Sequence, residues 1–198
     1  MGEYGNRVFL DVAAYHEAGH VLSALNEGLW VKQAHVSFAD PGAGYIVHAP
    51  LPPNPFDPGD GPGSARAAWQ HTVHTTVAVI RIALAGPLAE AKSVGTPLRA
   101  LGARSDLDMC QLWAVRLQEL HAHMSRYVPL PPVGLRPLLN EQRRRVRRWL
   151  GVPKVWGMVS VLAARLYQHG FLTGEEIGDV LGARIKQTAQ GALWFKEP

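Results

Sequence analysis

His16, Glu17 and His20 form the pattern in this sequence that most directly suggests chemistry. They lie in His16-Glu17-Ala18-Gly19-His20, which has the form HExxH. Residues four apart share one face of an α-helix, so both imidazoles can reach one metal ion. Glu17 lies about 100° further round the helix and can contact a metal-bound water without binding the metal. This pattern is typical of catalytic zinc, which lowers the pKa of its water to about 7 so that a carboxylate can take the proton.

A catalytic zinc site needs a third protein ligand, which the HExxH motif does not contain. The longer motif HExxHxxGxxH is absent, because residue 26 is Asn. Judged by residue type, the third ligand is a carboxylate or a histidine from elsewhere in the chain. The candidates are Glu90, Asp106, Asp108, His35, His48, His71, His74, His121 and His123.

The motif lies in a segment that we expect to be a helix, residues 11–27, with Asp11 as its N-cap and Gly28 as its stop. Alternating β-formers predict strands at 29–37 and 44–48, joined by a turn that contains Asp40, Pro41 and Gly42. We therefore expect a small β-sheet next to the HExxH helix.

The remainder of the chain is predicted to be mainly helical. Apolar spacing indicates a helix at 65–93, or two helices separated near Pro87, and further helices at 105–127, 139–150, 154–169 and 174–188. Thr173 and Glu176 form a predicted capping box for the last of these. Proline-rich segments at 49–64 and 128–137 are predicted to be irregular loops, the first of them a lid or a disordered segment. The expected architecture is one mainly α domain over residues 1–198, with a two- or three-stranded sheet.

Composition excludes several classes of protein. With 47% hydrophobic and 18% charged residues, the chain is neither disordered nor fibrous. No uncharged apolar run is long enough to predict a membrane span, and the N-terminus carries no secretory signal pattern. A single cysteine, Cys110, excludes an internal disulfide. We therefore expect a cytoplasmic protein.

A cluster of arginines at positions 143–148 accounts for much of the net charge of +4. Such clusters can bind nucleic acid or anionic lipid, although most are solvated helix faces. No helix-turn-helix, RNA-recognition or zinc-finger pattern accompanies the cluster, so the sequence predicts no nucleic-acid partner.

Four segments, in order along the chain, resemble the peptidase domain of FtsH-type zinc proteases, which are membrane-anchored AAA+ enzymes. The first is AYHEAGH, which is followed by the short segment GYIVH. The other three are IALAGPLAEAKSVG, GARSDLDMCQLWAVRL and VSVLAARLYQHGFLTGEEIGDVL. Together they cover about residues 9–185. It implies that His16, His20 and Asp106 bind Zn²⁺ and that Glu17 is the catalytic base. It also implies that Glu90 lies near the metal and that the Gly44–Tyr45 strand pairs with substrate. Asp108 falls on a variable position of the family.

The sequence departs from the family's pattern at several points. Ala85-Gly86-Pro87 replaces the family's Gly-Gly-Arg, and Ala91 replaces a second glutamate. No GxxxxGK[ST] phosphate loop is present, so we expect no ATP binding by this chain. The resulting prediction is an ATP-independent zinc endopeptidase acting on unstructured polypeptides, with a homo-oligomer or a separate ATPase as a further expectation. The alternative is a catalytically degenerate scaffold that binds metal and peptides or a partner.

Overall fold

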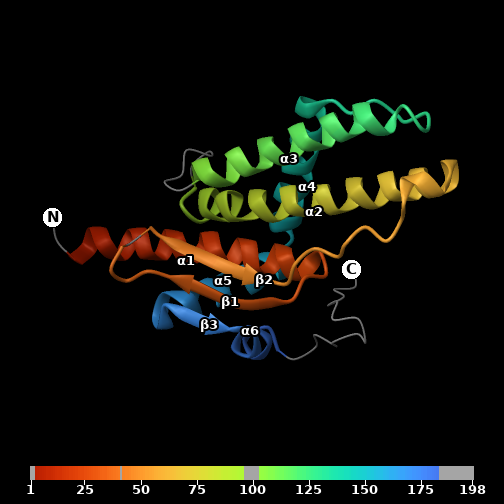
Figure 1. Ribbon diagram of the computed structural model, residues 1–198. Coiled ribbons are helices and arrows are strands. Elements are labelled where there is room, and N and C mark those ends of the chain that lie inside the picture. The colour runs from red at the N-terminus through yellow and green to blue at the C-terminus, as the bar shows by residue number, and fades with distance from the viewer. Residues whose placement is uncertain (1–2, 41, 96–102, 183–198) are drawn as a thin grey trace.

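The computed structural model describes residues 3–40, 42–95 and 103–182 and shows a mainly helical protein with a small antiparallel sheet (Figure 1). This confirms the predicted fold class. In the described ranges the chain forms, in order, α1 (Glu3–Asn26), β1 (Val31–Val36), β2 (Gly44–His48), the 3₁₀ turn η1 (Pro58–Asp60), α2 (Pro62–Ser93), α3 (Ala103–Met124), α4 (Leu135–Gly151), α5 (Pro153–His169), β3 (Phe171–Thr173) and α6 (Gly174–Val180).

The three strands form a sheet in the order β2-β1-β3, with β1 antiparallel to both neighbours. Ala34 of β1 lies opposite Ile46 of β2 and Leu172 of β3. Ala34 and Leu172 are buried, because this face of the sheet packs on the helices. Since β2 pairs with β1 on one side only, its other edge is unpaired within the described residues.

Helix α1 lies at the centre of the fold and packs against α2, α5, β1 and β2. A β-carbon at Gly19 would lie 2.6 Å from the carbonyl oxygen of Ala85 and 2.8 Å from Cβ of Ala89. The backbones of α1 and α2 therefore approach closely at the HExxH motif. Fully buried aliphatic side chains fill the core around them: Leu22 and Leu25 of α1, Ile80 and Leu84 of α2, and Leu162 and Leu166 of α5.

Pro87 does not divide α2, which runs unbroken for 32 residues. A proline inside a helix costs about 3 kcal/mol, because it removes one hydrogen bond and crowds the preceding turn. Residues 82–90 are all buried. Burying a leucine stabilises the fold by about 1.5–3 kcal/mol, so Leu84 and Leu88 alone offset the proline. The prediction of one helix here is confirmed, and the alternative of two helices is wrong.

Several helix boundaries differ from those that the proline and capping residues predict. Helix α1 begins at Glu3, so Asp11 lies inside the helix and is not its N-cap. The loops predicted at 49–64 and 128–137 end earlier, at residues 61 and 134, because proline is tolerated in the first turn of a helix. The Thr173–Glu176 capping box is confirmed, but α6 ends at Val180, and residues 183–188 of that predicted helix lie outside the described residues.

Within the described residues, α2 is the one helix long and apolar enough to cross a bilayer by length and hydropathy. However, 61% of its most apolar window is buried inside the protein. That degree of burial is typical of a core helix.

Candidate metal centre

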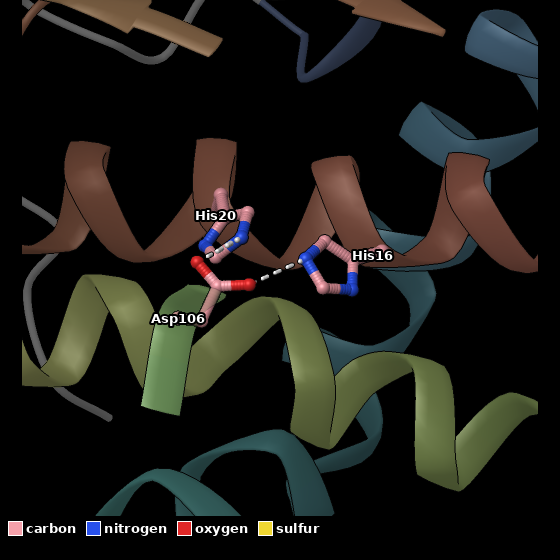
Figure 2. Close-up of side chains that lie close together, drawn as sticks. All are labelled: His16, His20 and Asp106. Atoms are coloured by element: carbon pink, nitrogen blue, oxygen red, sulfur yellow. Dashed lines mark hydrogen bonds and ion pairs between the residues drawn. The ribbon is translucent and has the colours of Figure 1, made fainter. Parts of the chain in front are cut away.

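His16 and His20, one turn apart on α1, both face the carboxylate of Asp106 on α3 (Figure 2). The Nε2 atom of His16 lies 3.1 Å from Oδ2 of Asp106, and Nε2 of His20 lies 3.5 Å from Oδ1. One ligand atom from each of the three residues lies within 4.8 Å of the other two. Both histidines are buried, so the group is a compact and mostly desolvated set of ligand atoms.

The second ring nitrogen of each histidine is held by α2. Nδ1 of His16 lies 2.7 Å from Oε2 of Glu90, and Nδ1 of His20 lies 2.7 Å from the carbonyl oxygen of Ile82. A neutral imidazole that donates from Nδ1 presents an unprotonated Nε2, the form that binds metals. Glu90 and Ile82 therefore turn both Nε2 atoms toward Asp106.

The chemistry of these ligand atoms fits a divalent transition metal. Two imidazole nitrogens and one carboxylate oxygen are the ligands found in zinc sites that keep one coordination position open. In a tetrahedral shell with bonds of about 2.0–2.1 Å, neighbouring ligand atoms lie about 3.3 Å apart. Nε2 of His16 lies 3.1 Å from Oδ2 of Asp106 and Nε2 of His20 lies 3.5 Å from Oδ1, so each imidazole lies close to that spacing from one of the two carboxylate oxygens. The buried His16, His20 and Asp106 group could thus hold a metal ion.

The site concentrates negative charge around the two imidazoles. Burial by itself lowers the pKa of His16, but its hydrogen bonds with Asp106 and Glu90 and the charge of Glu17 outweigh burial and raise the pKa to about 9. Burial by itself raises the pKa of Asp106, but hydrogen bonds with His16 and His20 hold it well below its usual range. The surrounding carboxylates therefore favour a positive charge at this place, which either a proton or a metal cation provides.

Glu17 lies beside the three residues but does not belong to the group of ligand atoms. Its side chain is buried, and burial raises the pKa of its carboxyl group. A β-carbon at Gly44 would lie 2.7 Å from both Cγ and Oε1 of Glu17. The backbone of β2 therefore passes directly over the Glu17 side chain, and only glycine leaves room for this approach.

A pocket of about 680 Å³ opens at this centre and falls in the size range of small-molecule sites. All seven residues selected from the sequence line it: His16, Glu17, His20, Gly44, Tyr45, Glu90 and Asp106. Most of the remaining wall is apolar, with Val12, Ile46, Leu51, Val79, Ile82, Met109 and Trp113 among its residues. None of the described lysines and arginines lines it.

The candidate third ligands differ in where the structure places them. Asp106 is the one that groups with both histidines, whereas Asp108 is exposed on α3 and does not line the pocket. His48 lines the pocket, but its Nδ1 atom lies 2.6 Å from the carbonyl oxygen of Ala49. The other candidate histidines do not line the pocket.

Sequence reasoning missed two features of α2 at this centre, the Ile82 carbonyl and Gly86. A β-carbon at Gly86 would collide with Nε2 of His20 and would lie 2.8 Å from Cδ2 of His16. Gly86 therefore keeps free the space beside the nitrogen that faces Asp106. A glycine within a buried helix is unfavourable on helix propensity alone, which is the signal that could have identified it.

We expect Gly86→Ala to weaken metal binding at least about 10-fold, because the new methyl group displaces the His20 ring. Gly157→Ala on α5 is the matched control, since a β-carbon there meets nothing within 4 Å. It should leave metal affinity unchanged and raise stability by up to about 1 kcal/mol. Competition titration with a chromogenic chelator and thermal unfolding measure the two effects. Unchanged metal affinity in Gly86→Ala would contradict the role given to this glycine.

Cys110, one turn after Asp106, is 2% exposed, and its thiol lies 3.6 Å from the carbonyl oxygen of Ile80. Burial and the charge of Asp106 raise the pKa of the thiol to about 12. Because the thiolate is the nucleophile, iodoacetamide at about pH 8 should alkylate the folded protein at least about 100-fold more slowly than the urea-unfolded chain. Intact-mass measurement follows the reaction, and equal rates would show that Cys110 is accessible in the folded protein.

No protein-family profile matches the chain, and no curated protein sequence matches it significantly. The likeness to FtsH-type peptidases therefore remains a resemblance carried by short motifs.

Proposed function

We propose that this protein is a zinc-dependent endopeptidase that cleaves unstructured polypeptides or peptides. One observation carries the proposal: the buried His16, His20 and Asp106 group shares a pocket with the carboxylate of Glu17. Three protein ligands with an adjacent carboxylate are the arrangement of catalytic rather than structural zinc. His16, His20 and Asp106 would hold the metal.

Zinc, when bound, would supply a Lewis acid that activates water and polarises a carbonyl group. In this proposal the Glu17 carboxylate accepts a proton from the attacking water and later delivers it to the amine nitrogen of the leaving group. Burial supports this role, because it raises the pKa of the Glu17 carboxyl group and so makes the carboxylate a stronger base. Glu90 and the Ile82 carbonyl keep the two imidazoles oriented throughout.

The free edge of β2 is the proposed place for an extended substrate backbone. Main-chain hydrogen bonds to an edge strand provide affinity without requiring a particular sequence. Because Gly44 lies against Glu17, a peptide paired along β2 would run past the proposed base. Among the described residues, no lysine or arginine lines the pocket to bind a terminal carboxylate, which supports cleavage of internal bonds.

The proposed substrates are flexible, because strand pairing requires an extended segment of chain. No phosphate-loop motif occurs in the sequence, so we propose that this reaction does not require ATP. A separate ATPase partner, a homo-oligomeric assembly and a cytoplasmic location stay predictions.

Metal analysis combined with a digestion assay tests the proposed function. Purified protein should contain about one zinc per chain and should cleave unfolded casein without ATP. A chelator should remove the metal and stop cleavage, and added zinc should restore it. A tightly folded substrate protein is the control and should resist. The absence of cleavage of any unstructured substrate by zinc-loaded protein would reject the endopeptidase.

A further inference from the structure

Positive charge is concentrated in one part of the molecule, away from the candidate metal centre. Residues 135–169, which span α4 and α5, contain eight lysines or arginines and one glutamate, a formal charge of +7. The whole chain carries +4, so all remaining residues together carry −3. No residue of α4 lines the metal-centre pocket, and α4 crosses behind α2 and α3 in Figure 1.

The charge lies on the exposed side of α4, since its other side is packed in the core. Gln142, Val146 and Leu150 are buried where α4 packs on α2, α3 and α5. The opposite side exposes five arginines, Arg136, Arg144, Arg145, Arg147 and Arg148, which we call the arginine face. At 100° per residue, these five positions are spread over about 180° of the helix circumference.

Most of the arginine face has no ion-pair partner among the residues that the structure describes. Arg145 is paired with Glu141 at 2.8 Å, but no carboxylate of the described residues forms an ion pair with the other four arginines. A surface hollow of about 440 Å³ is lined by Arg144, Arg147, Arg148 and one carboxylate, that of Glu141. The hydrogen bond from Arg145 and the charges of Arg144 and Arg148 lower the pKa of the Glu141 carboxyl group. The electrostatic potential at this surface is therefore positive.

We propose that the arginine face of α4 binds nucleic acid through the phosphate backbone, without reading the base sequence. Guanidinium groups form paired hydrogen bonds with phosphate oxygens, and the residues exposed here are arginine rather than lysine. A basic stripe along one helix is the electrostatic footprint of such binding. The sequence motifs predicted no nucleic-acid partner. The proposal differs because the fold gathers these arginines on one exposed side of α4.

Two observations favour a polynucleotide over a membrane surface. The exposed large hydrophobic side chains of the described residues lie on other elements, so α4 has none to insert into a bilayer. A flat membrane also contacts only one side of a cylindrical helix, whereas the arginines spread over half of its circumference. A flexible strand or a groove can follow that curvature.

Fluorescence anisotropy with a labelled single-stranded oligonucleotide of about 20 nucleotides tests the proposal. If the four unpaired arginines each neutralise one phosphate, affinity should fall about 50-fold between about 50 and 200 mM salt. Arg144→Ala/Arg148→Ala should weaken binding and reduce the slope of log affinity against log salt by about 1.4. The matched control, Arg66→Ala/Arg126→Ala, removes the same charge from exposed positions outside α4 and should retain the wild-type slope.

The outcomes separate the possibilities. Circular dichroism should show that both double variants are folded, because every substituted side chain is exposed. The proposal is overturned if the oligonucleotide does not bind at about 50 mM salt, or if the control variant loses as much affinity as the α4 variant. It is also overturned if vesicles of about 70% phosphatidylcholine and 30% phosphatidylserine bind through α4 while the oligonucleotide does not. None of these measurements depends on peptidase activity.

Discussion

Replacing Glu17 by glutamine is expected to abolish nearly all peptide hydrolysis while the protein keeps its fold and its metal. The amide has almost the same shape as the carboxylate but has no basic oxygen to accept a proton from water. General-base catalysis contributes about 10²–10⁴-fold, so the rate on a quenched fluorogenic peptide or unfolded casein should fall by that factor. Metal content should stay at the wild-type level, because Glu17 lies outside the group of ligand atoms.

Glu175→Gln is a suitable control for this experiment, because Glu175 is exposed on α6 and does not line the pocket. It should cleave at the wild-type rate. Full activity in Glu17→Gln would remove Glu17 from the mechanism. If the zinc-loaded wild type cleaves nothing and Glu17→Gln binds peptides equally well, the protein is the metal- and peptide-binding scaffold instead.

Asp106→Asn is expected to lose most of the bound metal, whereas Glu90→Gln should retain it with affinity lowered about 10–100-fold. The reason is position: Asp106 faces both Nε2 atoms, while Glu90 contacts only Nδ1 of His16. Changes to groups that orient a ligand usually have effects of about that size. Metal content after dialysis against a weak chelator measures the difference.

Asp108→Asn removes the same charge from an exposed position two residues away and should bind metal as the wild type does. His20→Ala should lose tight binding, because two remaining ligands hold zinc poorly. Thermal unfolding of the metal-free variants shows whether each one is folded. Full metal content in Asp106→Asn, combined with its loss in Glu90→Gln, would make Glu90 the ligand.

Local sequence patterns predicted the elements that depend on nearest neighbours along the chain. The spacing of His16 and His20 placed both on one helix face, because helical periodicity is a property of the backbone itself. The strand at Gly44–His48 and the Thr173–Glu176 capping box were also predicted correctly, since both follow from short-range propensity and hydrogen bonding.

Helix boundaries that depend on packing were predicted less well. Pro87 is unfavourable in isolation, yet α2 continues through it because residues 82–90 are buried on all sides by other elements. The early starts of α2 and α4 have a different cause, namely that the prolines at Pro62 and Pro137 lie in first turns. The sequence alone does not show whether a proline lies in the first turn of a helix or in its interior.

By itself, the sequence determined the two histidines and the glutamate on one helix, because their relation is set within two turns of backbone. The resemblance implied Asp106 as the third ligand, whereas residue types alone left nine candidates. Only the tertiary structure shows that, of these nine, Asp106 lies with the two histidines, which it reaches across 90 residues of chain. The Ile82 carbonyl and Gly86 could not be foreseen as parts of the centre, because their roles arise where α1 and α2 come into contact. Ligand orientation and the space beside each nitrogen are properties of that contact between helices, which neither helix specifies alone.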